Sequence, residues 1–72
     1  MNETPIRAYS KQELAQSYFP GIAPRSAVNR LRAWIDRCGP LSQALHDAGY
    51  RKTSKWFTAL EVGLIVHYLG DP

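Results

Sequence analysis

The clearest hydrophobic pattern in the chain lies between residues 24 and 38. Apolar residues recur there at spacings of three and four, which is typical of an α-helix with one buried side. They are Ala27, Val28, Leu31, Trp34, Ile35 and Cys38. Pro24 suits the first turn of a helix because its missing N–H needs no partner there, and Gly39 with Pro40 favours an end near residue 37 or 38. The pattern predicts a long helix from Pro24 onward with Trp34 in the core.

A shorter helix is predicted before it. Residues 10–13 (Ser-Lys-Gln-Glu) read as a capping box, in which Ser10 and Glu13 satisfy each other's backbone N–H groups. The helix would run from about Lys11 to Tyr18, with Leu14 facing inward. Residues 19–21 (Phe-Pro-Gly) end it, since the proline disfavours helical geometry in the residue before it.

Two more helices follow in the second half of the chain. Pro40 opens one that closes near Ala48, ahead of a glycine. Residues 58–61 (Thr-Ala-Leu-Glu) form a second capping box, which starts a final helix to about Leu69.

Two segments favour extended structure. Residues 6–9 alternate in polarity, and residues 50–57 have aromatic ends with a polar tip, which suits a loop or a small wing. Trp56 and Phe57 are interpreted as core anchors rather than base-stacking residues, since adjacent aromatics place at most one outward. Residues 1–5 are expected to be disordered and residues 6–72 to form one domain. The predicted fold is mainly α, with four short helices in a helix-turn-helix-like arrangement and possible winged-helix-like strands.

Size and composition argue against an enzyme. A chain of 72 residues supports one small core, and an enclosed substrate cleft would compete for the same side chains. Cys38 has no second cysteine to pair with, and His46 and His67 stand too far apart in the sequence to indicate a metal site. We therefore expect no catalytic residue, no metal and no cofactor. The absence of a signal peptide or membrane-spanning pattern predicts a cytoplasmic protein.

Positive charge is concentrated in the middle of the chain. The net charge is +3, but residues 7 to 37 contain six Lys and Arg against two acids, and Arg51, Lys52 and Lys55 follow without an acid between them. Such a distribution favours a polyanionic partner.

A capped short helix, a turn and a second helix with a basic outer side form the layout of a helix-turn-helix, which points to double-stranded DNA as the partner. Four outward residues early in the second helix are predicted to read the major groove: Arg25, Ser26, Asn29 and Arg30. Four cations are predicted to hold phosphates: Lys11, Arg32, Lys52 and Lys55. A homodimer is expected because one such module has little contact area. The alternative is a protein–protein interaction adaptor that uses the same helix and binds no nucleic acid.

Two family resemblances accompany these residues. Residues 9–15 (Tyr-Ser-Lys-Gln-Glu-Leu-Ala) and 23–27 (Ala-Pro-Arg-Ser-Ala) resemble the opening of mercury-resistance-regulator-like and excisionase-like winged helix-turn-helix proteins. The longer turn at residues 18–23 and the helix near residues 41–48 depart from that pattern. The chain is more closely similar to a family of short Bacteroidetes proteins known as a domain of unknown function, which shares the Tyr-Phe-Pro turn of residues 18–20 and the Tyr-Leu-Gly ending of residues 68–70. The first resemblance implies a DNA-binding protein, such as a regulator or accessory factor of a mobile element. The second implies a bacterial, cytosolic protein and no particular activity.

Overall fold

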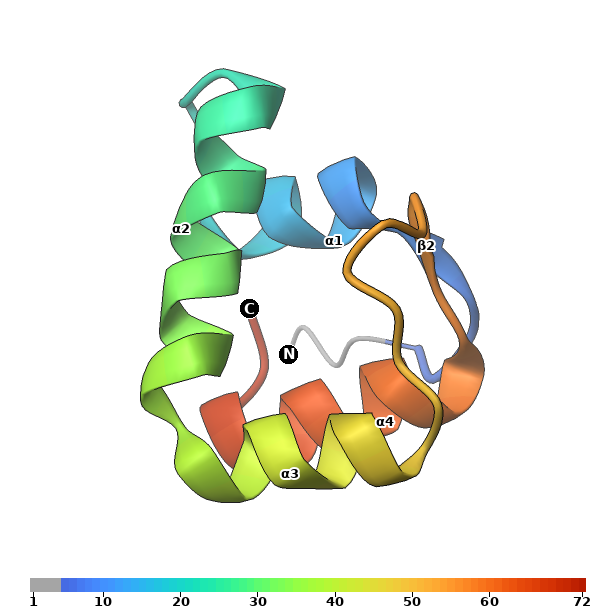
Figure 1. Ribbon diagram of the computed structural model, residues 1–72. Coiled ribbons are helices and arrows are strands. Elements are labelled where there is room, and N and C mark those ends of the chain that lie inside the picture. The colour runs from blue at the N-terminus through green and yellow to red at the C-terminus, as the bar shows by residue number, and fades with distance from the viewer. Residues whose placement is uncertain (1–4) are drawn as a thin grey trace.

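The computed structural model describes residues 5–72, which form four helices and a two-stranded antiparallel sheet (Figure 1). This confirms the predicted fold class. The elements in chain order are β1 (Tyr9–Ser10), α1 (Lys11–Tyr18), α2 (Pro24–Arg37), α3 (Gly39–Asp47), β2 (Trp56–Phe57) and α4 (Ala59–Leu69). The expected disorder of residues 1–5 falls mostly on residues 1–4, which lie outside the described residues.

The two extended segments pair with each other. Tyr9 lies opposite Phe57 and Ser10 lies opposite Trp56. Each strand has two residues, so most of the predicted strand at residues 6–9 is not part of the sheet. The pairing ties the start of α1 to the end of the loop between α3 and α4, and so brings together segments far apart in the sequence.

The two predicted caps differ in how completely they form. At α4 both bonds are present: the Glu61 N–H donates to Thr58 Oγ1 at 3.2 Å, and the Thr58 N–H donates to Glu61 Oε1 at 2.8 Å. At α1 the Glu13 N–H donates to Ser10 Oγ at 3.0 Å. The Glu13 carboxylate pairs with Arg7 instead of accepting a hydrogen bond from the Ser10 N–H. The first capping box is therefore half formed.

The core is built by all four helices. In Figure 1, α2 runs along one side of the molecule with α1 beside it, and α3 and α4 lie next to each other beyond its C-terminal end. The most deeply buried large side chains are Leu14, Leu31, Leu41, Leu45, Val62 and Ile65. The Tyr18 hydroxyl also joins α1 to the end of α4 by donating to the Gly70 carbonyl, and burial, followed by the charge of Asp71, raises the pKa of Tyr18 to about 12.

Two tryptophans predicted to lie in the core are instead exposed. Trp34 is 41% exposed and rests against the edge of Phe19, with ring centroids 4.6 Å apart. At 100° per residue it stands about 60° from Leu31, which is at the centre of the buried side of α2, so it reaches only the margin of the core. Trp56 is 58% exposed because successive strand residues point to opposite sides and Phe57 is the one that faces inward.

None of the helices among residues 5–72 combines the length and the apolar character that a membrane crossing would require.

Candidate nucleic-acid interface

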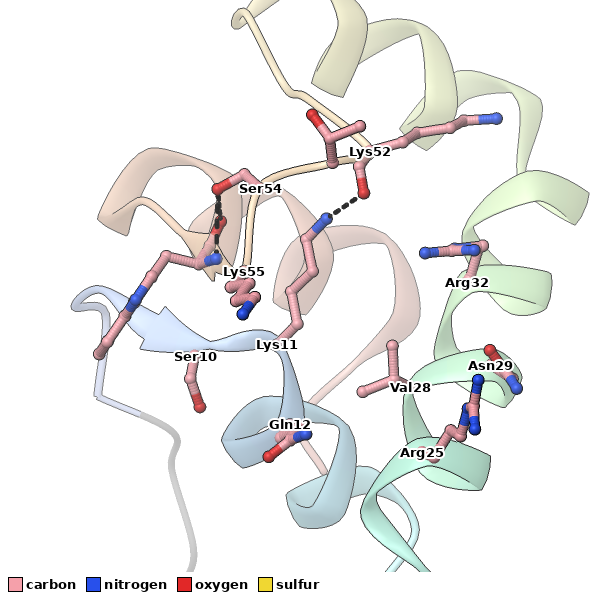
Figure 2. Close-up of a pocket in the computed structure, with 12 residues that line it drawn as sticks. Ser10, Lys11, Gln12, Arg25, Val28, Asn29, Arg32, Lys52, Ser54 and Lys55 are labelled. Carbon is pink, nitrogen blue, oxygen red and sulfur yellow. Dashed lines mark hydrogen bonds between the residues drawn. The ribbon is translucent and has the colours of Figure 1, made fainter.

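A groove of about 640 Å³ lies between α2, the start of α1 and the loop of residues 51–55 (Figure 2). We call it the basic groove, because five of its lining residues are cations: Lys11, Arg25, Arg32, Lys52 and Lys55. None of the described residues lining it is an Asp or Glu. The groove is therefore a concentrated site of positive charge on a protein whose net charge is only +3.

One side of the basic groove is formed by α2. Arg25, Asn29 and Arg32 follow the spacing i, i+4, i+7, which places all three within about 60° of one another around the helix. All three are exposed, and Figure 2 shows them along the same side of α2, across from the loop that carries Lys52 and Lys55.

Two of the predicted site residues lie on a different side of the helix. Ser26 and Arg30 stand about 100° and 140° around α2 from Arg25, are exposed, and do not line the basic groove. Arg37 lies between them in angle, at about 120°. The cations of α2 are thus divided between two flanks, with Asn29 on the outermost part of the helix.

The opposite side of the basic groove is the loop. Lys52 and Lys55 are exposed and line the groove, as a phosphate-binding role requires. Arg51 is equally exposed but is not among the residues that line it. Residues from the two halves of the chain therefore meet across this groove.

Lys11 is the one predicted phosphate contact that the structure contradicts. Lys11 is only 7% exposed, and its ammonium donates to the carbonyl oxygens of Arg51 and Lys52, both at 3.1 Å. Figure 2 shows the bond to Lys52. The same ammonium lies over the ring of Tyr50, 4.7 Å from its centroid. The prediction was wrong because helix position alone places Lys11 on an exposed first turn, whereas the loop folds over it.

Lys11 instead fixes the loop to the body of the protein. Besides the two side-chain bonds, the Lys11 N–H donates to the Lys55 carbonyl at 2.9 Å. One residue therefore holds both ends of the segment that carries the basic side chains. Burial, followed by the charge of Arg32, lowers the pKa of the Lys11 ammonium, and Glu61 partly opposes this.

We expect Lys11→Met to loosen the loop. Methionine keeps the length and the apolar stem but has no donor, so the two carbonyls lose a contact worth about 1–3 kcal/mol. The Ser54 amide, which donates to the Arg51 carbonyl, should then exchange its hydrogen roughly 5- to 150-fold faster. Lys52→Met is the matched control, because the Lys52 side chain is exposed. In this variant the Ser54 amide should exchange at the same rate as in the native protein. Unchanged exchange in Lys11→Met would show that the loop holds its shape without this residue.

Trp56 is a large residue of the basic groove that the predicted site did not include. Trp56 lines the groove and is exposed, although its position beside Phe57 suggested a core role. A strand of two residues is too short for its alternation to indicate which residue faces inward, so no sequence signal identified it.

No group of three or more His, Cys, Asp or Glu residues in the described part of the chain is arranged to hold a metal ion. Cys38 is a free, partly buried thiol, and His46 lies on the surface beside Asp47, with 3.9 Å between Nδ1 and Oδ1.

Comparison with known proteins places almost the whole chain in one family. The model of a domain of unknown function, DUF4248, matches residues 5–72. The protein belongs to this family. This match confirms the predicted resemblance to a domain of unknown function. The Bacteroidetes origin and the resemblance to mercury-resistance-regulator-like and excisionase-like proteins stay predictions. No curated protein and no solved structure matches the chain.

Proposed function

We propose that this DUF4248 protein binds double-stranded DNA through a helix-turn-helix formed by α1 and α2, with the loop of residues 51–55 acting as a wing. The observation that carries the proposal is the basic groove, where cations from α2 and from the loop converge. None of the described residues that line the groove is acidic. A polyanion is the partner that best complements such a surface.

The division of cations on α2 fits a helix lying in a major groove. A helix in that position has a sugar-phosphate strand on each side. On one flank Arg32 faces the loop, so a strand passing through the basic groove would meet Arg32, Lys52 and Lys55 together. Arg30, which was predicted from the sequence to read bases, stands about 140° around α2 from Arg25 and outside the basic groove, so we reassign it to a phosphate of the second strand. The two groups of cations would thus hold two different strands.

Base contacts are assigned to the N-terminal half of α2. Arg25, Ser26 and Asn29 are exposed there, and arginine and asparagine can form paired hydrogen bonds with guanine and adenine. Asp36 is exposed near the C-terminal end of α2, where its charge would repel a phosphate. The helix should therefore enter the groove by its first two turns, as helix-turn-helix proteins do.

The contact area of one module is small, so we propose that tight binding uses a homodimer. The resemblance to excisionase-like and mercury-resistance-regulator-like proteins supports a role as a regulator or accessory factor of a bacterial mobile element.

A second candidate function is protein binding through another surface. Trp34 is 41% exposed and packs on Phe19, about 180° around α2 from Arg25. Exposed aromatic residues are common in protein interfaces. An adaptor of this kind would use Trp34 and leave the basic groove free.

Salt dependence separates the two functions. Four phosphate contacts, from Arg30, Arg32, Lys52 and Lys55, predict a slope of about −3.6 for log affinity against log salt, or a loss of roughly 150-fold between 50 and 200 mM salt. The measurement is fluorescence anisotropy of a short labelled duplex of mixed sequence titrated with the protein. Equal affinity at both salt concentrations, or no binding at the lower one, would rule out the DNA function.

A further inference from the structure

Trp56 is the largest apolar side chain on the basic groove. It is 58% exposed, whereas its neighbour Phe57 is 2% exposed and packs in the core. It lines the groove together with Lys55 and Arg25. A tryptophan in this position gives the groove an apolar wall beside its cations.

The backbone of Trp56 is held in place on two sides. The Ser54 hydroxyl accepts a hydrogen bond from the Trp56 N–H at 3.2 Å and donates one to the Trp56 carbonyl at 3.1 Å. The strand pairing with Ser10 fixes the opposite edge. With its backbone already fixed, Trp56 has only its two χ angles left to order when a ligand covers it, which keeps the entropic cost of that contact low.

Most of the other aromatic side chains of the described residues pack against a neighbouring ring. Tyr50 and Phe57 stack on each other at 5.8 Å, and Trp34 packs against Phe19. Trp56 takes part in no aromatic pair among residues 5–72, so its ring is available for a ligand.

We propose that Trp56 packs against the deoxyribose face of the DNA strand that lies in the basic groove. This inference rests on the proposed function and specifies how the strand is gripped. The phosphates of a duplex strand alternate with sugars, whose carbon atoms are the apolar surface that the strand's backbone presents. A groove with Lys52 and Lys55 for the phosphates and Trp56 for the sugars matches both chemistries of one strand.

The test observes Trp56 by itself. The chain has two tryptophans, so Trp34→Phe leaves Trp56 as the single tryptophan and Trp56→Phe leaves Trp34. Excitation at the red edge of the tryptophan absorption band avoids emission from the tyrosines. In Trp34→Phe, saturating duplex DNA should shift the emission to shorter wavelength and protect the ring from acrylamide quenching. In Trp56→Phe, the emission and quenching of Trp34 should not change, because Trp34 lies about 180° around α2 from Arg25.

Affinity gives the second readout. Trp56→Ala should weaken binding of the labelled duplex about tenfold, as expected for losing burial of roughly 60 Å² of apolar surface. Trp56→Phe should recover part of the loss. Circular dichroism of the exposed-site variant Trp56→Ala should match that of the native protein.

The outcomes separate the two proposals. If anisotropy shows duplex binding but acrylamide quenches Trp56 equally with and without DNA, the sugar contact is wrong and the DNA function stands. Tighter binding of a single strand than of the duplex, lost in Trp56→Ala, would replace the sugar contact with base stacking and overturn the inference. Absence of binding to any DNA by the native protein overturns both.

Discussion

Neutralising Arg32 and Lys52 together, as Arg32→Gln and Lys52→Gln, is expected to lower the affinity for duplex DNA about 200-fold at 50 mM salt. Each lost phosphate contact removes about 0.9 from the slope of log affinity against log salt, so the pair removes about 1.8. We take the electrostatic contribution to the binding affinity to vanish near 1 M salt. A slope change of about 1.8 over the roughly twentyfold range from 1 M to 50 mM then gives the loss of about 200-fold. The two residues face each other across the basic groove, from α2 and from the loop. The measurement is duplex anisotropy over a series of salt concentrations.

The matched control removes the same net charge elsewhere. Arg51 is exposed in the same loop but does not line the basic groove, and Arg7 is exposed and paired with Glu13. The double variant Arg7→Gln, Arg51→Gln should keep nearly the native slope. If both double variants lose the same affinity, binding depends on net charge alone and the basic groove is not the interface.

Leu31→Ala is expected to destabilise the fold by about 2–5 kcal/mol. Leu31 is 2% exposed at the centre of the buried side of α2, where truncation leaves a cavity between helices. A domain of this length has a free energy of unfolding of roughly 4–11 kcal/mol, so the substitution removes a large part of it. Thermal unfolding followed by circular dichroism should show a fall in Tm of at least about 8 °C.

Leu60→Ala makes the same chemical change on the surface. Leu60 is 62% exposed in the first turn of α4. The free energy of unfolding of the Leu60→Ala protein should therefore stay within about 0.5 kcal/mol of the native value. Equal Tm values for the two variants would mean that α2 does not bury Leu31. The assignment of the opposite side of α2 as its exposed side would then also be wrong.

The helices were predictable because their signals are local. Pro24 at the start of α2 and the Thr58–Glu61 capping box at the start of α4 act within one helical turn, and the structure has both where the sequence placed them. The basic outer side of α2 was also predictable, since helical spacing separates Arg25 and Asn29 from the buried Leu31.

The positions of Lys11, Trp34 and Trp56 were not predictable in this way. Lys11 is polar and at a helix start, yet the loop buries it by accepting its hydrogen bonds. The two tryptophans are strongly apolar, yet Trp34 reaches only the margin of the core and Trp56 points away from it. In each case the burial of the side chain depends on which other segments pack against it. The residue type alone does not specify those segments.

The sequence by itself determined four helices, the complete cap at Thr58 and Glu61, and the concentration of cations on α2 and in one loop. Only the tertiary structure decided that the loop with Lys52 borders the Arg32 side of α2 and not the Arg30 side, and that Lys11 is buried as the support of the loop. The physical reason is the distance along the chain over which each interaction acts. Caps join residues three apart, whereas the Lys11 ammonium meets a carbonyl 40 residues away, and such a contact depends on how the whole core packs.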